Sequence, residues 1–324
     1  MQQQGKLDWV LEATGIQEGQ YESVTVVEDE LISIEEALNQ LQISREDEFI
    51  LNLTGGTKIM SIGVYNYFSY RNSEIFYIPI GKNLYRKIFP PVKERDFVLQ
   101  YRTTLQTYLT SYGIRIVNPE KINQLTKSAA FTELFFNKNY SRRYELKTLR
   151  DFKSLNKNGG INRSDFTKLF DWLEVIHFPF EQKNILNAKE ITYLLGGWLE
   201  EYTYLFFKRH LNLSDDAIGI GVEISRQSVK NEFDVMFVYN NAIYVFECKT
   251  GLTQKVFYEA AVYKLAALKK DFGLFVNSNI VTMTNVKDQV WKDRAAFFNI
   301  KLLDNLSQSK GKKYINTIIK EMKK

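Results

Sequence analysis

The sequence is poor in the residues that build disulfide-linked proteins and histidine- or cysteine-rich metal sites. Its 324 residues contain one cysteine, Cys248, and two histidines, His177 and His210. A single cysteine excludes an internal disulfide and any zinc or iron–sulfur site built from several cysteines. No apolar run approaches the roughly 20 residues of a membrane span, and Met1–Val10 lacks the apolar core of a signal peptide. We therefore expect a reduced, cytoplasmic protein with no membrane segment.

The composition is that of a globular chain long enough for about two domains. Lysine and arginine number 43 against 38 aspartates and glutamates, so the net charge of +5 permits an anionic partner without requiring one. Three patterns follow one another along the chain. Residues 1–105 alternate strand-like and helix-like segments, residues 106–186 favour a helical linker or accessory region, and residues 187–324 combine a long helix with several strands. We expect an α/β protein with these three parts.

The densest chemistry lies on a predicted β-hairpin with its turn at Asn240-Asn241. A two-residue turn there places Asp234 opposite Glu247, with Cβ atoms about 4.5–5.5 Å apart on one face of the sheet. Two carboxylates so close repel each other unless a cation lies between them, and they therefore predict a Mg²⁺ or Mn²⁺ site. Lys249 shares this face, because side chains alternate along a strand. Its amine can orient a water molecule or neutralise a phosphate.

A third carboxylate can come from the helix that precedes the hairpin. Glu200 and Glu201 point about 100° apart on this helix, so only one of them can face the hairpin. We prefer Glu200, because the paired glycines Gly196-Gly197 allow a close approach of helix and sheet on its side. The backbone carbonyl of Cys248 is a further candidate ligand. The alternative for the whole cluster is a salt-bridge ladder without catalytic function.

The order of these elements resembles the core of the PD-(D/E)xK nucleases. One branch of that family is especially similar, namely the CRISPR-associated effectors of the Can/Card type, which join a CARF sensor domain to a restriction-endonuclease-like α/β domain. The segments that carry the resemblance are Gly196–Tyr202, Asn231–Val235 and Glu247–Lys249. It implies metal-dependent cleavage of phosphodiester bonds, with Asp234 and Glu247 as metal ligands. It also implies that Lys249 is catalytic and that Glu200 assists.

A glycine turn in the first part of the chain follows an apolar strand-like run and precedes a helix. It consists of Thr54, Gly55, Gly56, Thr57 and Lys58. Glycines let backbone N–H groups approach an anion, a helix N-terminus favours negative charge, and the threonine and lysine side chains add donors. The spacing matches neither a P-loop nor a G-x-G-x-x-G motif. The segment predicts a phosphate or ribose cradle, with a plain strand-to-helix turn as the alternative.

The run Thr54–Met60 is similar to the ligand motif of CARF domains. The resemblance implies a Rossmann-like sensor domain in residues 1–105, a homodimer, and a cyclic oligoadenylate as activator, cyclic tetra-adenylate in particular. CARF domains begin with a strand and a helix that have no evident counterpart ahead of Thr54. We therefore expect a sensor that lacks its first strand and helix.

Three functions remain open at this point. The first is an endonuclease of type III CRISPR antiviral defence that cyclic oligoadenylate activates, and that cleaves single-stranded DNA or RNA or nicks supercoiled DNA. The second is a restriction-type or repair-type nuclease that needs no activator, with the glycine turn as a structural element. The third is a nucleotide-sensing module without turnover, in which the carboxylate hairpin is a salt-bridge ladder.

Overall fold

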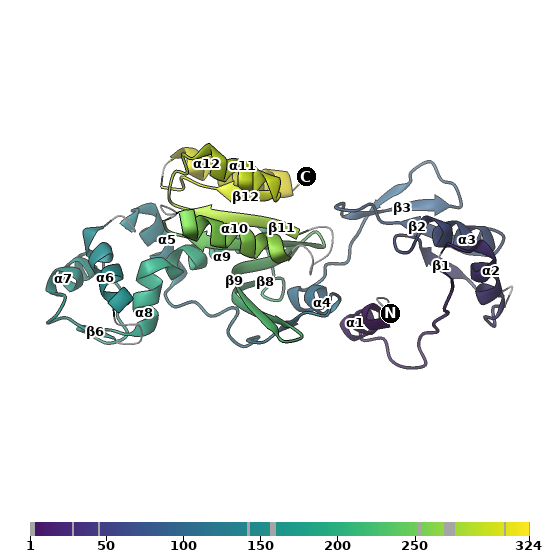
Figure 1. The fold of residues 1–324 in the computed structure, drawn as a ribbon, viewed down its shortest axis with the longest axis horizontal. Helices are drawn as coiled ribbons and strands as arrows, with labels where there is room; N and C mark the ends of the chain where they lie inside the picture. The colour runs from purple at the N-terminus through teal and green to yellow at the C-terminus, as the bar shows by residue number, and fades with distance from the viewer. Residues whose placement is uncertain are drawn as a thin grey trace. The chain divides into compact units, whose positions relative to one another are not determined.

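The structure is a computed structural model that describes residues 4–27, 29–44, 46–140, 143–155, 160–251, 255–268, 276–307 and 309–323. The chain forms two compact units, and the boundary between them falls inside helix α1 (Gln4–Thr14). The smaller unit is Val10–Thr103, and the larger unit is Met1–Trp9 together with Thr104–Lys324 (Figure 1). No helix in the described ranges is long and apolar enough to cross a membrane.

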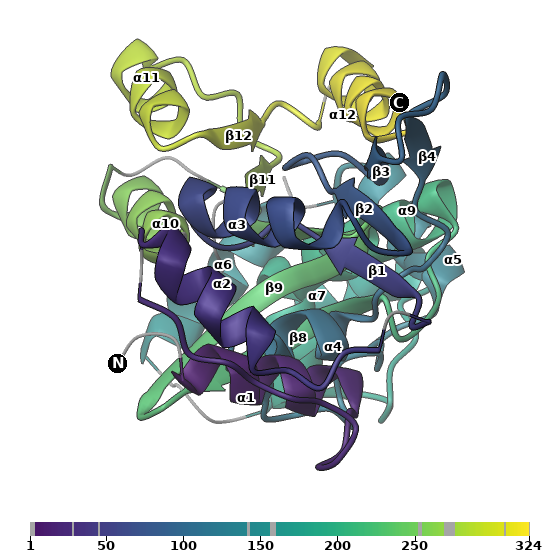
Figure 2. The same cartoon turned by 90° about the vertical axis from the view of Figure 1, so that its right-hand side faces the viewer.

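The smaller unit is a four-stranded sheet with two helices on one face (Figure 2). Its elements are α2 (Leu31–Asn39), β1 (Phe49–Asn52), α3 (Lys58–Phe68), β2 (Ser73–Tyr77), β3 (Leu84–Phe89) and β4 (Asp96–Val98). The strand order is β1-β2-β3-β4, and β1 and β2 run parallel. Leu38 of α2 and Phe68 of α3 pack with Ile75 of β2 in the core of this unit. On the other side of the sheet Ile50 is 78% exposed.

The predicted strand before the glycine turn and the predicted helix after it are confirmed, because β1 ends at Asn52 and α3 begins at Lys58. A strand over Tyr21–Val27, which the alternation of its residues predicts, is wrong. That segment has no regular secondary structure, and Val24 and Val27 are 43% and 54% exposed. Alternation reports the propensity of single residues, but a strand also needs a partner to pair with. Among the described residues no strand comes before β1.

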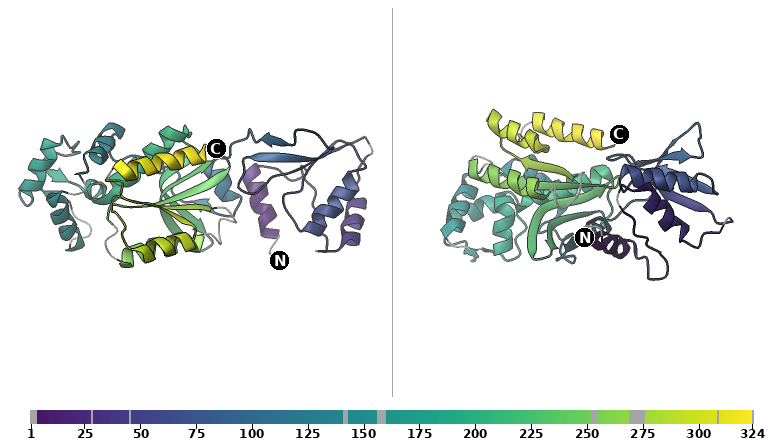
Figure 3. Two further views of the ribbon diagram at one scale, coloured as in Figure 1. Left: turned by 90° about the horizontal axis from the view of Figure 1, so that it is seen from above. Right: turned by 45° about the vertical axis from the view of Figure 1, so that its right-hand side comes forward.

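The larger unit is built around a six-stranded sheet with the order β12-β11-β10-β9-β8-β5. The strands are β5 (Arg115–Ile116), β8 (Ile218–Arg226), β9 (Val229–Tyr239), β10 (Ala242–Lys249), β11 (Val276–Thr282) and β12 (Ile300–Leu303). The helices that follow or flank them are α4 (Leu105–Thr110), α9 (Trp198–Leu211), α10 (Lys255–Leu268), α11 (Gln289–Phe297) and α12 (Ser309–Met322). Helices α9 and α10 cover opposite faces of the sheet (Figure 3), since Val235 and Phe246 pack with α9 whereas Met236 and Val245 pack with α10.

Residues between α4 and α9 form a mainly helical region that belongs to the same compact unit as the six-stranded sheet. Its elements are α5 (Ala129–Asn137), α6 (Tyr144–Leu155), β6 (Ile161–Asn162), α7 (Thr167–Val175), β7 (Ile185–Leu186), α8 (Ala188–Thr192) and the π-helix η2 (Tyr193–Gly197), which runs directly into α9. The three-part division at residues 105 and 186 stays a prediction.

The hairpin register is confirmed. Strands β9 and β10 pair antiparallel from Tyr239 with Ala242 to Val235 with Phe246, as a turn at Asn240-Asn241 requires. Both asparagines have positive φ angles, 51° and 58°, which is the backbone of a two-residue type I′ turn.

The start of the chain packs on the larger unit through Trp9. A Cβ added at Gly113 would come within 3 Å of the Trp9 indole, and the backbone there is left-handed, with φ +69°. The guanidinium of Arg226 stacks over the same indole at 5.3 Å from the ring centre. Gly113 therefore lets α1 approach the larger unit closely.

We predict that Gly113→Ala lowers the free energy of unfolding of the larger unit by about 2–4 kcal/mol, because it adds a clash to backbone strain. The matched control is Gly221→Ala, which has a similar φ of +56° but open space around the added Cβ. It should cost only the strain, about 1 kcal/mol. All four tryptophans lie in the larger unit, so urea unfolding followed by their fluorescence measures it. Equal losses in the two variants would contradict the packing role of Trp9.

Candidate functional site

Three of the residues singled out on the hairpin converge on one point. The Lys249 ammonium lies 2.6 Å from Glu247 Oε1 and 3.3 Å from Asp234 Oδ2. Both carboxylates are largely buried, with side-chain exposures of 6% for Glu247 and 13% for Asp234. One cation thus bridges the two acids, which lie on the same side of the hairpin.

The end of the β9–β10 ladder explains how Asp234 comes to lie there. The regular pairing stops at Val235 and Phe246. Beyond this point the backbone N–H of Cys248 donates to Asp234 Oδ2 at 2.6 Å. The carboxylate is therefore held against the backbone of β10. The Cys248 side chain points the other way and contacts Thr203 Oγ1 of α9 at 3.5 Å.

The acidic side chains of this cluster lie close enough together to shift one another's pKa. Burial, and then the charge of Glu247, raise the pKa of Asp234. Burial and then the charge of Asp234 raise the pKa of Glu200 to about 8. Burial alone would lower the pKa of Lys249, but Asp234 and Glu247 outweigh it, so the net shift is upward. The neighbouring carboxylates thus favour the charged ammonium of Lys249, while burial and like charge favour the neutral forms of Asp234 and Glu200.

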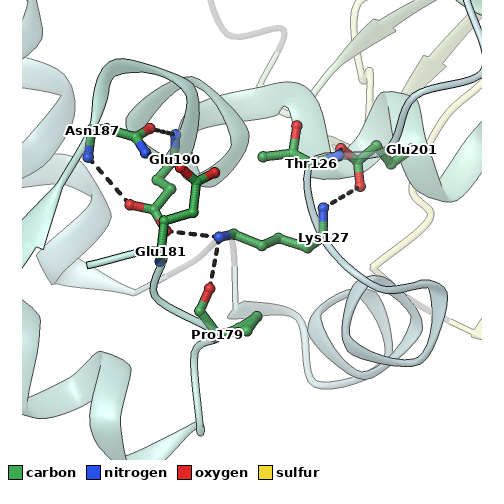
Figure 4. A network of polar contacts seen from close by, with 7 residues as sticks. All are labelled: Thr126, Lys127, Pro179, Glu181, Asn187, Glu190 and Glu201. Carbon is green, nitrogen blue, oxygen red and sulfur yellow. Dashed lines mark hydrogen bonds and ion pairs between the residues drawn. The ribbon is translucent and has the colours of Figure 1, made fainter. Parts of the chain in front are cut away.

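The two adjacent glutamates of α9 face different parts of the structure. Glu201 accepts a hydrogen bond from the Thr126 backbone N–H at 2.6 Å, just before α5 (Figure 4). It also accepts one from Thr132 Oγ1 of α5 at 3.3 Å. Glu200 instead feels the charges of Asp234 and Lys249. Glu201 therefore ties α9 to the helical region, and Glu200 is the α9 glutamate whose pKa responds to the charges of the hairpin.

The reason given for preferring Glu200 is wrong, however. A Cβ added at Gly196 would meet no atom within 4 Å, and one at Gly197 would meet only Thr192 of the same helical stretch. The glycines therefore do not mediate a close approach of helix and sheet. They end the π-helix η2, whose wider turn shifts the angular position of every later residue, Glu200 and Glu201 included.

A buried ion pair holds the same region from the other side of η2. Lys127 Nζ lies 2.7 Å from Glu190 Oε1 of α8 and also donates to the Pro179 carbonyl at 2.7 Å (Figure 4). The two side chains are 3% and 0% exposed. Glu190 also accepts from the backbone N–H of Asn187, closing a capping box at the start of α8. The segment before α5 thus connects α8 through the Lys127 side chain and α9 through Glu201.

One lysine of the cluster lies outside the hairpin and outside the residues singled out from the sequence. Lys264 of α10 places its ammonium 2.7 Å from Glu247 Oε2. Its position on the helix after a Glu-x-Lys hairpin was the available signal, but spacing alone does not tell which face of that helix meets the sheet. Within the described ranges, no three His, Cys, Asp or Glu side chains gather closely enough to hold a metal ion by themselves.

The glycine turn of the smaller unit follows β1 and opens α3. Thr57 is the N-cap of α3, and its hydroxyl accepts from the Met60 backbone N–H at 3.2 Å. The Thr54 hydroxyl accepts from the Ile78 backbone N–H at 2.8 Å, which ties the ends of β1 and β2 together. Gly55 and Lys58 are exposed. The turn therefore leaves backbone at Gly55 and an ammonium at Lys58 available at the N-terminus of a helix.

We predict that Lys127→Met destabilises the larger unit by about 3–5 kcal/mol, because it leaves the buried charge of Glu190 without its ion-pair partner. The double variant Lys127→Met/Glu190→Gln should recover part of this loss. Lys121→Met is the control, since Lys121 and Glu120 form a pair that is more than 60% exposed and 3.9 Å long, and it should change stability little. Urea unfolding provides the measurement, and a double variant weaker than the single one would count against a paired charge.

Two family models match the chain at its two ends. The Card1 CARF domain matches residues 1–108, and the Card1-like endonuclease domain matches residues 187–320. Together they cover about three quarters of the chain. A search among curated proteins finds no relative that matches.

Solved structures share the fold at low sequence identity. Protein VC1899 from Vibrio cholerae is 20% identical with a TM-score of 0.76, and the match covers 98% of this chain and 88% of that one. Can2 from Sulfobacillus thermosulfidooxidans, solved in complex with cyclic tetra-adenylate, is 21% identical with a TM-score of 0.69 and coverages of 94% and 84%.

A type III CRISPR defence DNA nuclease activated by cyclic oligoadenylate is 16% identical with a TM-score of 0.55, and the match covers 86% of this chain but only 39% of that one. These likenesses agree with a Rossmann-like unit joined to a nuclease-like α/β unit. The chain therefore belongs to the CARF-domain endonucleases, with a Card1-type CARF domain at residues 1–108 and a Card1-like endonuclease domain at residues 187–320.

Proposed function

We propose that this endonuclease is divalent-metal-dependent, that cyclic tetra-adenylate activates it, and that it cleaves single-stranded DNA or RNA or nicks supercoiled DNA. We further propose that it works as a cytoplasmic homodimer in type III CRISPR defence. The observation that carries the catalytic part is the convergence of Asp234, Glu247 and Lys249 on one point of a buried hairpin. Can2, which shares the fold, is the support for cyclic tetra-adenylate as the ligand.

The residues of the cluster fit a divalent cation. The Lys249 ammonium already occupies a position shared by Asp234 and Glu247, so a positive charge is accommodated between these two carboxylates. Two carboxylates, with water and substrate oxygens, form a common ligand set for Mg²⁺ and also suit Mn²⁺. We propose Asp234 and Glu247 as the ligands, with the backbone carbonyl of Cys248 as a further one. Bound Mg²⁺ or Mn²⁺ would polarise the scissile phosphate.

The chain's own groups then divide the remaining work. Lys249 stays protonated beside two acids, so we assign it the neutralisation of phosphate charge rather than the removal of a proton. Glu200 faces the same cluster from α9, and we assign it an assisting role. Because Asp234 and Glu247 are largely buried, few water molecules can screen their charges. Each of these charge interactions is therefore stronger than it would be in water.

The activator is proposed to bind at Thr54, Gly55, Gly56, Thr57 and Lys58. Two of these residues also shape the turn, because Thr54 bridges to Ile78 and Thr57 caps α3. The contacts left for a phosphate are therefore backbone N–H groups at the glycines and the Lys58 ammonium.

A cleavage assay with the full chain tests the function as a whole. It compares single-stranded DNA, single-stranded RNA and supercoiled plasmid, with Mg²⁺ or Mn²⁺, in the presence of cyclic tri-, tetra- or hexa-adenylate. We expect cleavage only with both metal and cyclic tetra-adenylate. Cleavage without any oligoadenylate would favour the hypothesis of a restriction-type or repair-type nuclease that needs no activator. Binding of the oligoadenylate without any cleavage would favour the sensing module.

We predict that Glu247→Gln and Lys249→Met each lower the cleavage rate by about 10²-fold or more, the scale of losing one charged group that stabilises a transition state. The affinity for cyclic tetra-adenylate, measured by calorimetry, should not change. Glu321→Gln removes a carboxylate that is 55% exposed in the same unit, and it should cleave like the parent chain. Retained metal-dependent cleavage in both site variants would refute the assignment.

We predict that Gly55→Ala weakens binding of cyclic tetra-adenylate by about tenfold or more, because the methyl group would stand where a ligand approaches the backbone. The protein itself has no atom within 4 Å of an added Cβ at Gly55, so the fold should tolerate it. Gly15→Ala is the control in the same unit: its added Cβ is equally open, and its φ of +73° adds backbone strain, so it should bind cyclic tetra-adenylate like the parent chain even if it lowers stability. Unchanged affinity in Gly55→Ala would remove the glycine turn from the ligand site.

A further inference from the structure

Each oxygen of the Glu247 carboxylate has an ammonium of its own. Oε1 lies 2.6 Å from Lys249 Nζ, and Oε2 lies 2.7 Å from Lys264 Nζ. The carboxylate is 6% exposed, and the two lysine side chains are 35% and 29% exposed. Its orientation is therefore fixed from both ends, which one ammonium alone would not achieve.

The packing of α10 imposes the direction of Lys264. Ala261, Val262 and Leu265 on either side of it are buried against the sheet, with exposures of 3%, 0% and 0%. The Lys264 ammonium also lies 4.9 Å from the centre of the Phe233 ring, on β9. A lysine placed between a buried carboxylate and an aromatic face differs from a solvated surface lysine, because both neighbours restrict where its charge can lie.

The two lysines are not equivalent. Lys249 reaches Asp234 as well as Glu247, so it occupies the position that both carboxylates share. Lys264 contacts the opposite oxygen of Glu247. A divalent cation held by both carboxylates would need the position of the Lys249 ammonium, which would then be available to the substrate phosphate, whereas the contact of Lys264 with Oε2 could persist.

We propose that Lys264 is a positioning residue, which holds Oε2 of Glu247 so that Oε1 is presented to a divalent cation shared with Asp234. This inference rests on the proposed function. Partners that orient a metal-binding carboxylate usually matter 10–100-fold for metal affinity or activity. Two other roles are separable from it: a direct contact with the substrate phosphate, and an ion pair that serves only stability.

The test compares Lys264→Met, Lys264→Arg and the parent chain at saturating Mn²⁺ and cyclic tetra-adenylate. We expect Lys264→Met to lower kcat about tenfold or more while KM for nucleic acid stays within about twofold. Lys264→Arg keeps a donor at Oε2 and should recover most of the rate. Mn²⁺ binding without nucleic acid, followed by electron paramagnetic resonance, should persist in all three proteins, because both carboxylates remain.

The matched control is Lys301→Met. Lys301 lies on β12 in the same unit, is 50% exposed, and pairs with Glu321 at 3.6 Å. A raised KM with intact kcat in Lys264→Met would overturn the proposal in favour of a phosphate contact. If Lys264→Met has the same kcat and KM as Lys301→Met, the ion pair of Lys264 with Glu247 serves only stability, and the proposal fails. Loss of all Mn²⁺ binding would also overturn it, because Lys264 would then hold the whole site together.

Glu247→Gln, assayed in parallel, separates this proposal from the proposed function. If Glu247→Gln cleaves like the parent chain, the catalytic assignment itself fails. If Glu247→Gln is inactive while Lys264→Met matches the control, only the positioning role fails.

Discussion

The candidate site of the larger unit depends on a single electrostatic arrangement, in which two buried carboxylates share one ammonium. Asp234 and Glu247 lie side by side because the hairpin turn fixes their register, and without a cation their charges would repel each other at this spacing. The buried strands around them cannot relax to separate the charges, since Val235, Val245 and Phe246 are fully buried. The structure therefore selects for positive charge at this point, whether it comes from Lys249 or from a metal ion.

The surrounding helices place further charges around that point in an asymmetric way. Helix α10 supplies Lys264 to one oxygen of Glu247, and α9 supplies Glu200. The angular position of α9 follows from the π-helix η2 before it and from two anchors on the segment before α5, the Glu201 contacts and the Lys127–Glu190 pair. Because a shift of one residue turns a helix by about 100°, these anchors decide which of two adjacent glutamates faces the hairpin.

The sequence was sufficient where the determinants are local and insufficient where they are distant. The turn at Asn240-Asn241, the alternation of the two strands and the convergence of Asp234, Glu247 and Lys249 follow from neighbours within about 18 residues, and the structure has them. The contacts of Glu201 with Thr126 and of Lys264 with Glu247 depend on how helices pack, and spacing within one helix does not encode that. Tyr21–Val27 shows the converse, since strand propensity without a partner strand produced no strand.

The candidate ligand turn lies in the smaller unit, and the carboxylate cluster lies in the larger one. The ligand and the catalytic groups therefore do not share a binding site within one unit. A cyclic oligoadenylate can change cleavage only by binding two states of the protein with different affinity. Such coupling is reciprocal for equilibrium binding, so a nucleic acid that binds the active state preferentially must tighten binding of the activator by the same factor.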